Sequence, residues 1–243
     1  MRDRQVIRVL GPIDIETPEG EIAVGGRQVR ALLGAFAIGV NHAVPIDHLK
    51  EVLWADDPPA SADNTLQSYV SHLRGLLGVG AIIRRDHSYR LNATPSEVDA
   101  TLFEASVIRA SALEKTPEER LHHCREALQL WRGRPFGDLA DDEAFKLETY
   151  RLEEMRLTAM EYSLEAELAL GRHELIVGEL ESAVREHPYH ERLWFLLIEA
   201  LARSGRRVEA LREVTHLRRT LSEVGLRVGN DIAELERRVL DDV

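Results

Sequence analysis

A repeated helical pattern in the second half of the chain most constrains its fold. Two segments, AELALGRHELIVGELESAV at 166–184 and EALARSGRRVEALREVTHL at 199–217, each place a Leu/Ala-rich run before a Gly-Arg pair and an amphipathic run after it. The two glycines, Gly171 and Gly205, lie 34 residues apart. A 34-residue helix–turn–helix period is typical of tetratricopeptide repeats, whose units stack to bury their apolar faces. The pattern therefore predicts an all-α, tetratricopeptide-like repeat domain.

Helical composition extends back to about residue 96. The segment at 117–135, PEERLHHCREALQLWRGRP, fits the second helix of an earlier unit, offset by an insertion at 136–145. Trp131 and Trp194 lie in apolar stripes, so we expect both to pack between helices rather than form a partner site. The repeat domain is predicted to span 96–243.

The first 95 residues show a different order of elements. The sequence predicts β runs at 5–16 and 19–26, helices at 27–39, 45–54 and 62–78, and a β-hairpin at 81–91. Ser61 is a candidate cap for the third helix, since its hydroxyl can accept from a first-turn amide. Helix, helix, loop, helix, hairpin is the order of a winged helix-turn-helix domain. We therefore predict an α+β winged helix-turn-helix domain at 1–95, followed by the all-α repeat domain.

The third of these helices has two contrasting faces. Leu66, Val70, Leu73 and Leu77 recur at helical spacing and predict a buried stripe. The other face carries Thr65, Gln67, Ser68, Ser71, His72 and Arg74. After Asp63 in its first turn, this helix has no carboxylate at all.

The absence of acids is unusual in a chain with a formal net charge of -11. The charge is uneven: residues 1–95 hold 10 Lys/Arg and 11 Asp/Glu, so nearly all of the excess acid lies in 96–243. An acidic protein is a poor non-specific nucleic-acid binder, because attraction to phosphates needs positive potential. A locally neutral reader of DNA in the first part remains compatible with this balance.

Cellular location is predicted from what the sequence lacks. The longest apolar stretches, such as ALLGAFAIGV at 31–40, are too short to span a membrane, and the first residues show no secretory signal. The single cysteine, Cys124, cannot form an internal disulfide. We expect a protein of the reducing cytoplasm without membrane contact.

Catalytic and metal-binding motifs are absent from the pattern. The sequence has no phosphate-binding loop, nucleophile elbow or zincin motif, so we expect no enzyme activity and no cofactor. His122, His123 and Cys124 are adjacent and therefore point about 100° apart on a helix, which predicts no metal site. The acidic pairs at 56–57 and 141–142 are interpreted as solvated turns.

Short motifs along nearly the whole chain resemble the Streptomyces antibiotic regulatory protein family of transcriptional activators. The first half resembles its OmpR-like winged helix at LGPIDI (10–15), GRQVRALLGAF (26–36), LW (53–54), PPASADNTLQSYVSHLRGLLG (58–78) and YRL (89–91). The second half resembles its bacterial transcriptional activator domain at VDATLFE (98–104), ALQLWRGRP (127–135), AELALGRH (166–173), EHPYHERL (186–193) and SGRRVEAL (204–211). One departure is Ser88, which stands before Tyr89 where the family usually has glycine, so the hairpin turn lacks its permissive residue.

The resemblance implies a bacterial, cytoplasmic and nucleoid-associated protein that is a sequence-specific activator of a secondary-metabolite, or antibiotic, gene cluster. Such a protein binds direct repeats in double-stranded promoter DNA, self-associates there and engages RNA polymerase, with the sigma-factor region as the expected contact. Because carboxylates facing phosphates would be repelled, the acid-free helix face fits a major groove. Gln67 suits adenine, the hydroxyls and His72 suit base edges or phosphates, and Arg74 suits guanine or phosphate.

Three hairpin arginines, Arg84, Arg85 and Arg90, are predicted to contact the DNA backbone or the minor groove. Arg27 and Arg30 are within reach of phosphates in the same interpretation, and Arg27 also fits a plain surface position. The alternative interpretations are a solvated amphipathic helix and an edge strand guarded by charge. At the level of the whole protein, the alternative is an interaction adaptor whose winged helix contacts protein rather than DNA.

Overall fold

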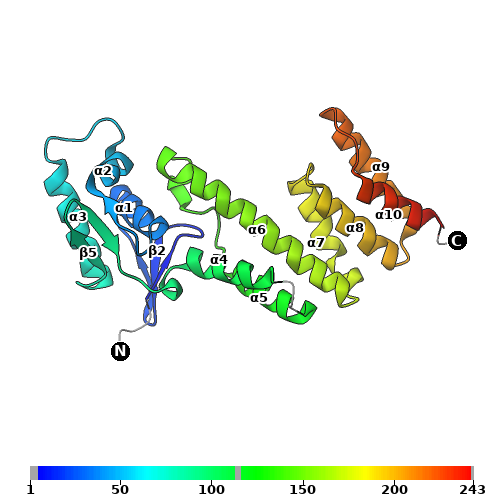
Figure 1. The fold of residues 1–243 in the computed structure, drawn as a ribbon, viewed down its shortest axis with the longest axis horizontal. Helices are drawn as coiled ribbons and strands as arrows, with labels where there is room; N and C mark the ends of the chain where they lie inside the picture. Colours follow the sequence, from blue (N-terminus) through cyan, green and yellow to red (C-terminus); the bar gives the residue numbers. More distant parts are fainter. Residues whose placement is uncertain (1–4, 113–115, 242–243) are drawn as a thin grey trace. The chain divides into compact units, whose positions relative to one another are not determined.

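The chain, described by a computed structural model over residues 5–112 and 116–241, begins with short strands and continues almost entirely as helices (Figure 1). It divides into two compact units. Unit 1 comprises residues 1–108 and 126–157, and unit 2 comprises residues 109–125 and 158–243. The division into a domain at 1–95 and another at 96–243 stays a prediction, because the compact units are made from other segments.

Unit 1 opens with a small antiparallel sheet of β1 (Val6–Arg8), β2 (Asp14–Thr17) and β3 (Gly20–Ala23), in that order. Ile7 pairs with Ile15 across the first two strands, and both are buried. The alternating β pattern predicted these strands, and the Gly11-Pro12 turn separates them as expected.

Three helices and a second sheet follow. They are α1 (Arg27–Ile38), β4 (Val44–Pro45), α2 (Ile46–Trp54), α3 (Ala62–Leu77), β5 (Ile82–Arg85) and β6 (Ser88–Leu91). The second sheet has the order β4-β6-β5, and α1 packs against both α2 and α3. These elements agree with the predicted sequence of helices and hairpin.

Ser61 does not cap α3 as predicted. It occupies the N-cap position, but its side chain bonds no backbone amide of the helix. Its hydroxyl instead lies 3.4 Å from the Thr65 hydroxyl, one turn further on. The first turn of α3 therefore lacks the side-chain cap that the sequence suggested.

Unit 1 also contains the chain after the hairpin. The elements there are a 3₁₀ turn η1 (Pro95–Glu97), α4 (Asp99–Ala110), a 3₁₀ turn η2 (Gly137–Leu139) and the first part of α6 (Glu143–Ala169). The segment before η2 pairs with the loop after β1, since the amides of Arg132 and Phe136 donate to the carbonyls of Leu10 and Val9, both at 2.8 Å.

Two buried carboxylates fasten this loop. Asp14 is 4% exposed, and its carboxylate accepts from Arg8 and, at 2.6 Å, from Arg132. Asp99 is 2% exposed and accepts from the amides of Val9 at 2.8 Å and Leu10 at 3.0 Å. Burial raises the pKa of the Asp99 carboxyl to about 6, against the opposing effect of these amides. Residues far apart in sequence thus fix the loop between β1 and β2 in place.

Unit 2 consists of helices that pack in succession. Helix α5 (Pro117–Gln129) contributes its residues up to 125 to this unit, and its last turn belongs to unit 1. After it and the second part of α6 come α7 (His173–Glu186), α8 (Glu191–Arg203), α9 (Arg207–Glu223) and α10 (Asn230–Asp241). Helix α8 packs against α7 and α9, and α10 packs against α8 and α9 (Figure 1). The repeated glycines, Gly171 and Gly205, have φ values of 75° and 73°. Because this left-handed region favours glycine, the two matching turns explain the 34-residue signal.

The two tryptophans of the apolar stripes pack as expected, though not equally deeply. Trp194 is fully buried in unit 2, where its indole donates to the Pro188 carbonyl at 3.0 Å. Trp131 is half-buried in unit 1, with its ring edge-on to Phe103 at 5.2 Å and Arg156 over its face at 4.8 Å. All three contacts are internal to the respective unit.

Within residues 5–112 and 116–241, no helix is long and apolar enough to cross a membrane.

Replacing Arg132 with alanine should destabilise unit 1 by about 3 kcal/mol, because the buried Asp14 carboxylate loses one of its two cations. Urea denaturation followed by tryptophan fluorescence measures this, since Trp54 and Trp131 both lie in unit 1. The matched control is Arg134→Ala, which removes an exposed pair with Asp141 and should leave the stability close to that of the parent. Equal effects of the two substitutions would contradict the structural role of the buried pair.

Candidate nucleic-acid interface

The inner face of α3 is anchored as the sequence predicted. Leu66, Val70, Leu73 and Leu77 are all buried, at most 8% exposed. The stripe packs toward α1 and the β5 strand, which α3 contacts. Because these side chains fix the rotation of the helix, the opposite face must point outward.

This opposite face, called here the α3 outer face, consists of the six predicted polar side chains. They are Thr65, Gln67, Ser68, Ser71, His72 and Arg74. Gln67, Ser71 and His72 are exposed, and so is Ser68, while Thr65 and Arg74 are half-buried. The structure therefore brings the predicted residues to one surface, although two of the six are partly covered.

The one carboxylate of α3 is neutralised from outside the helix. Asp63 lies 2.8 Å from the Lys50 ammonium, which α2 supplies. The hydrogen bond with Asp63 raises the pKa of Lys50 above its ordinary value. Sequence reasoning missed Lys50, because its partner lies in the next helix and no spacing rule connects them. Helix α3 thus begins with a paired acid rather than a free one.

Two side chains of the α3 outer face make bonds within unit 1. The Arg74 Nε donates to the Ile82 carbonyl at 2.9 Å and ties α3 to β5. The Ser68 hydroxyl donates to the Asn64 carbonyl at 3.0 Å, one turn back. Arg74 has five N–H donors, so this bond occupies one of them but restrains where the guanidinium can reach.

The hairpin separates its three arginines. Arg84 pairs across the strands with Tyr89, and Arg85 pairs with Ser88. Because strand side chains alternate, Arg85 and Arg90 share one face, whereas Arg84 shares the other with the buried Tyr89. The Arg84 guanidinium lies over the Tyr89 ring at 5.8 Å. The arginines therefore do not form one contiguous set.

The turn of the hairpin is made without the family's glycine. Asp86 takes the left-handed conformation, with a φ of 47°. Ser88 begins β6, and its hydroxyl donates to the Arg85 carbonyl at 2.8 Å. Aspartate tolerates this region of φ better than most residues, which explains how Ser88 is accommodated.

Arg27 and Arg30 are engaged by carboxylates of the same unit. Arg27 binds Asp142 at 2.6 Å, and Arg30 binds Asp138 at 2.7 Å. The bond from Arg30 holds the pKa of Asp138 below its usual range. These ion pairs fasten α1 to the segment around η2 and leave the two arginines poorly placed for phosphates.

The acidic pair at 141–142 also differs from the predicted solvated turn. Asp141 forms a two-bond pair with Arg134, with both distances 2.8 Å, and this bond lowers the pKa of Asp141. Asp142 is the partner of Arg27. Asp141 is exposed and Asp142 is half-buried, yet each has a specific cation. Sequence position alone did not reveal these partners.

Cys124 does not join its histidine neighbours in any surface cluster. It is fully buried in unit 2, and burial raises the pKa of its thiol to about 11. A buried thiol of this kind is inert as a nucleophile and as a ligand.

Comparisons with known proteins place the chain in the class of bacterial transcriptional regulators. The family model "Bacterial transcriptional activator domain" matches residues 98–240. Regulatory protein DnrI of Streptomyces peucetius is 31% identical over 96% of this chain and 91% of its own length. Regulatory protein AfsR of Streptomyces griseus is 34% identical over 96% of this chain, which spans only 24% of AfsR.

A solved structure resembles the whole described fold. Mycobacterium tuberculosis EmbR, in complex with a low-affinity phosphopeptide, superposes with a TM-score of 0.90 at 32% identity, over 98% of this chain and 65% of that one. The shared architecture is a small N-terminal β-sheet region followed by a helical domain. The chain belongs to the Streptomyces antibiotic regulatory protein family of transcriptional regulators, as its motifs predicted.

Replacing Gly75 with alanine should stabilise the chain by about 0.5–1 kcal/mol. Gly75 is exposed in the interior of α3, and a Cβ added there meets no atom within 4 Å, so alanine gains helix propensity without a clash. Urea denaturation measures the change. In the control Gly34→Ala, the added Cβ would lie 2.8 Å from the Phe145 ring, and we expect destabilisation. Destabilisation by Gly75→Ala would show that the α3 outer face is not open at this point.

Proposed function

We propose that the chain is a sequence-specific DNA-binding activator of transcription. In this proposal α2 and α3 form the helix-turn-helix, and the β5–β6 hairpin forms the wing, of a winged helix-turn-helix domain at 1–95. The remainder, 96–243, is a tetratricopeptide-like activator domain. The target is a promoter of a secondary-metabolite gene cluster, as the family suggests.

The observation that carries the proposal is the lack of an unpaired carboxylate on α3. In a chain with a net charge of -11, helix α3 has one acid, Asp63 in its first turn, and Lys50 neutralises it at 2.8 Å. A helix in the major groove lies close to phosphates on both sides, so an unpaired acid there would be repelled. A face that merely contacts water has no such requirement.

Individual roles follow from chemistry and exposure. Exposed Gln67 is the side chain best suited to a base, since its amide can form two bonds with adenine. Ser71 and His72 are exposed beside it and suit base edges or phosphates. Thr65 and Ser68 are smaller contributors, because Thr65 is half-buried and the Ser68 proton is already donated within the helix.

The arginines divide into positioning groups. Arg85 and Arg90 share a face of the hairpin and suit the DNA backbone or the minor groove. Arg84, stacked over Tyr89, and Arg74, bonded to Ile82, are more restrained and suit single phosphate contacts.

In this proposal the helical domain, 96–243, activates transcription and does not itself contact DNA. Its excess of acid cannot hold phosphates, whereas a stack of helix pairs offers a rigid surface for protein partners. We propose that this surface pairs neighbouring copies on DNA and engages RNA polymerase, with the sigma-factor region as the contact.

Substitution of Gln67 by alanine should weaken specific promoter binding by about 1–3 kcal/mol, because a paired base contact is lost while no core contact changes. Fluorescence anisotropy with the full chain and labelled promoter DNA measures the difference. The matched control is Gln129→Ala, an exposed glutamine at the end of α5, which should bind like the parent.

Promoter binding by Gln67→Ala at parental strength would contradict groove recognition by this side chain. If binding also survived in the combined variant Gln67→Ala, Ser71→Ala, Arg85→Ala, the alternative of a protein-contacting winged helix would replace the proposal.

Binding to two half-sites in the same orientation should be cooperative. A nearly neutral DNA-binding domain is attracted only weakly to DNA phosphates, so a single copy binds with low affinity. Contacts between adjacent copies would raise the affinity of both. A separation of about 10–11 base pairs places both copies on one side of the duplex. Inserting about five base pairs, half a helical turn, should abolish cooperativity in a gel-shift titration. Unchanged cooperativity after this insertion would refute side-by-side binding.

A further inference from the structure

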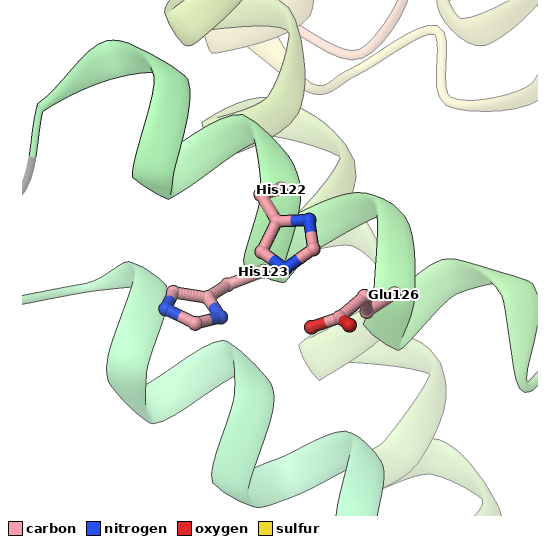
Figure 2. A group of neighbouring side chains, drawn as sticks. All are labelled: His122, His123 and Glu126. Carbon is pink, nitrogen blue, oxygen red and sulfur yellow. The ribbon is translucent and has the colours of Figure 1, made fainter.

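Three side chains that commonly bind metals converge on helix α5. His122, His123 and Glu126 each offer one ligand atom, and these atoms all lie within 4.8 Å of one another. Figure 2 shows the two imidazole rings and the carboxylate directed toward a common point beside the helix. His122 and Glu126 are exposed, whereas His123 is half-buried.

The helix itself produces this convergence. Successive residues turn by about 100°, so the two histidines alone would diverge. Glu126 is four residues after His122 and three after His123. Viewed down the helix axis, its side chain therefore projects between those of the two histidines, one turn further along the helix. The three side chains therefore occupy one arc of a single continuous helix. The prediction of no metal site rested on the divergence of adjacent residues and on the lack of a second ligand cluster at zinc spacing, and it did not consider Glu126.

Cys124, which lies between these positions in sequence, is not part of the cluster. It is 0% exposed and points to the inner side of α5. The available donor set is therefore two imidazole nitrogens and one carboxylate oxygen. This set matches the two-histidine, one-glutamate ligation found in zinc sites that keep an open position. Magnesium and calcium prefer oxygen ligands and do not suit it.

We propose that His122, His123 and Glu126 form a binding site for a divalent transition-metal ion of the zinc type. Zinc bonds to nitrogen and oxygen are about 2.0–2.2 Å, so three ligands around one ion lie about 3.4 Å apart. The side chains must close slightly from their present separations of up to 4.8 Å. Rotation of the exposed His122 and Glu126 side chains accomplishes this without movement of the helix backbone. Water completes the coordination.

Bound metal would link residues across one turn of α5 and stabilise the folded chain, since the unfolded chain does not hold the three ligands together. The site is separate from the α3 outer face and does not rest on the proposed DNA-binding function.

The test uses the full chain without any histidine tag. Competition of the protein with a chromophoric chelator for Zn²⁺ should reveal one bound equivalent, unaffected by excess Mg²⁺. His122→Ala and Glu126→Ala should each weaken binding at least ~10-fold, because each removes a ligand. The matched control is His48→Ala, since His48 is exposed and lies 3.4 Å from a single carboxylate, Glu51, among the residues that the structure describes. Its binding should equal that of the parent.

Cobalt substitution identifies the ligands independently. Bound Co²⁺ should show visible d–d bands without the intense near-ultraviolet charge transfer that a thiolate produces. A thiolate band would assign the metal to Cys124 and overturn the proposal. The proposal would also be contradicted if the chain bound no stoichiometric Zn²⁺. The same holds if His122→Ala and Glu126→Ala, shown by circular dichroism to be folded, bound Zn²⁺ as tightly as the parent.

Discussion

The ion pair between the buried Asp14 carboxylate and Arg132 is the interaction on which the arrangement of unit 1 most depends. The two residues are 118 positions apart, yet their 2.6 Å contact joins β2 to the segment before η2. A carboxylate so deeply buried is tolerated only when it is paired, because desolvation of a lone charge costs several kcal/mol. Asp99 reinforces the join by accepting from the amides of Val9 and Leu10. The small β-sheet therefore packs together with α4 and the η2 segment as parts of one compact unit.

This join bears on how the α3 outer face is held. Helix α1 packs against α3 and is itself fastened to the η2 region by Arg27 and Arg30. The polar face thus belongs to a unit that already includes part of the family-matched segment 98–240. A fragment ending at residue 95 would lose Arg132, one of the two cations that pair with Asp14, and also the aspartates that bind Arg27 and Arg30. Experiments on DNA binding are consequently more informative with the whole chain.

Local patterns were sufficient to predict most elements. The apolar spacing of α3 and the repeated glycines at 171 and 205 report on neighbours within a few turns, and helix and strand formation depends on such neighbours. The alternation of strand side chains would also have predicted that Arg84 and Arg85 face opposite ways.

Long-range partners were not predictable from one sequence. Nothing in the spacing connects Lys50 with Asp63, Arg74 with the Ile82 carbonyl, or Arg30 with Asp138, because tertiary packing alone brings them together. These contacts decide which polar groups of the candidate site are restrained. The chemistry of the residue types therefore indicated the α3 outer face as the candidate surface. The fold determines how far each of its side chains can extend.

Photochemical crosslinking of the full chain to promoter DNA, with the crosslinked peptides identified by mass spectrometry, tests the central claim most directly. The claim is that this regulator reads DNA through the α3 outer face and the adjoining hairpin. The predicted result is crosslinked peptides from 62–78 and from 82–91, reduced by unlabelled promoter competitor and not by unrelated DNA. Crosslinks confined to α6–α10, or equal competition by unrelated DNA, would contradict it.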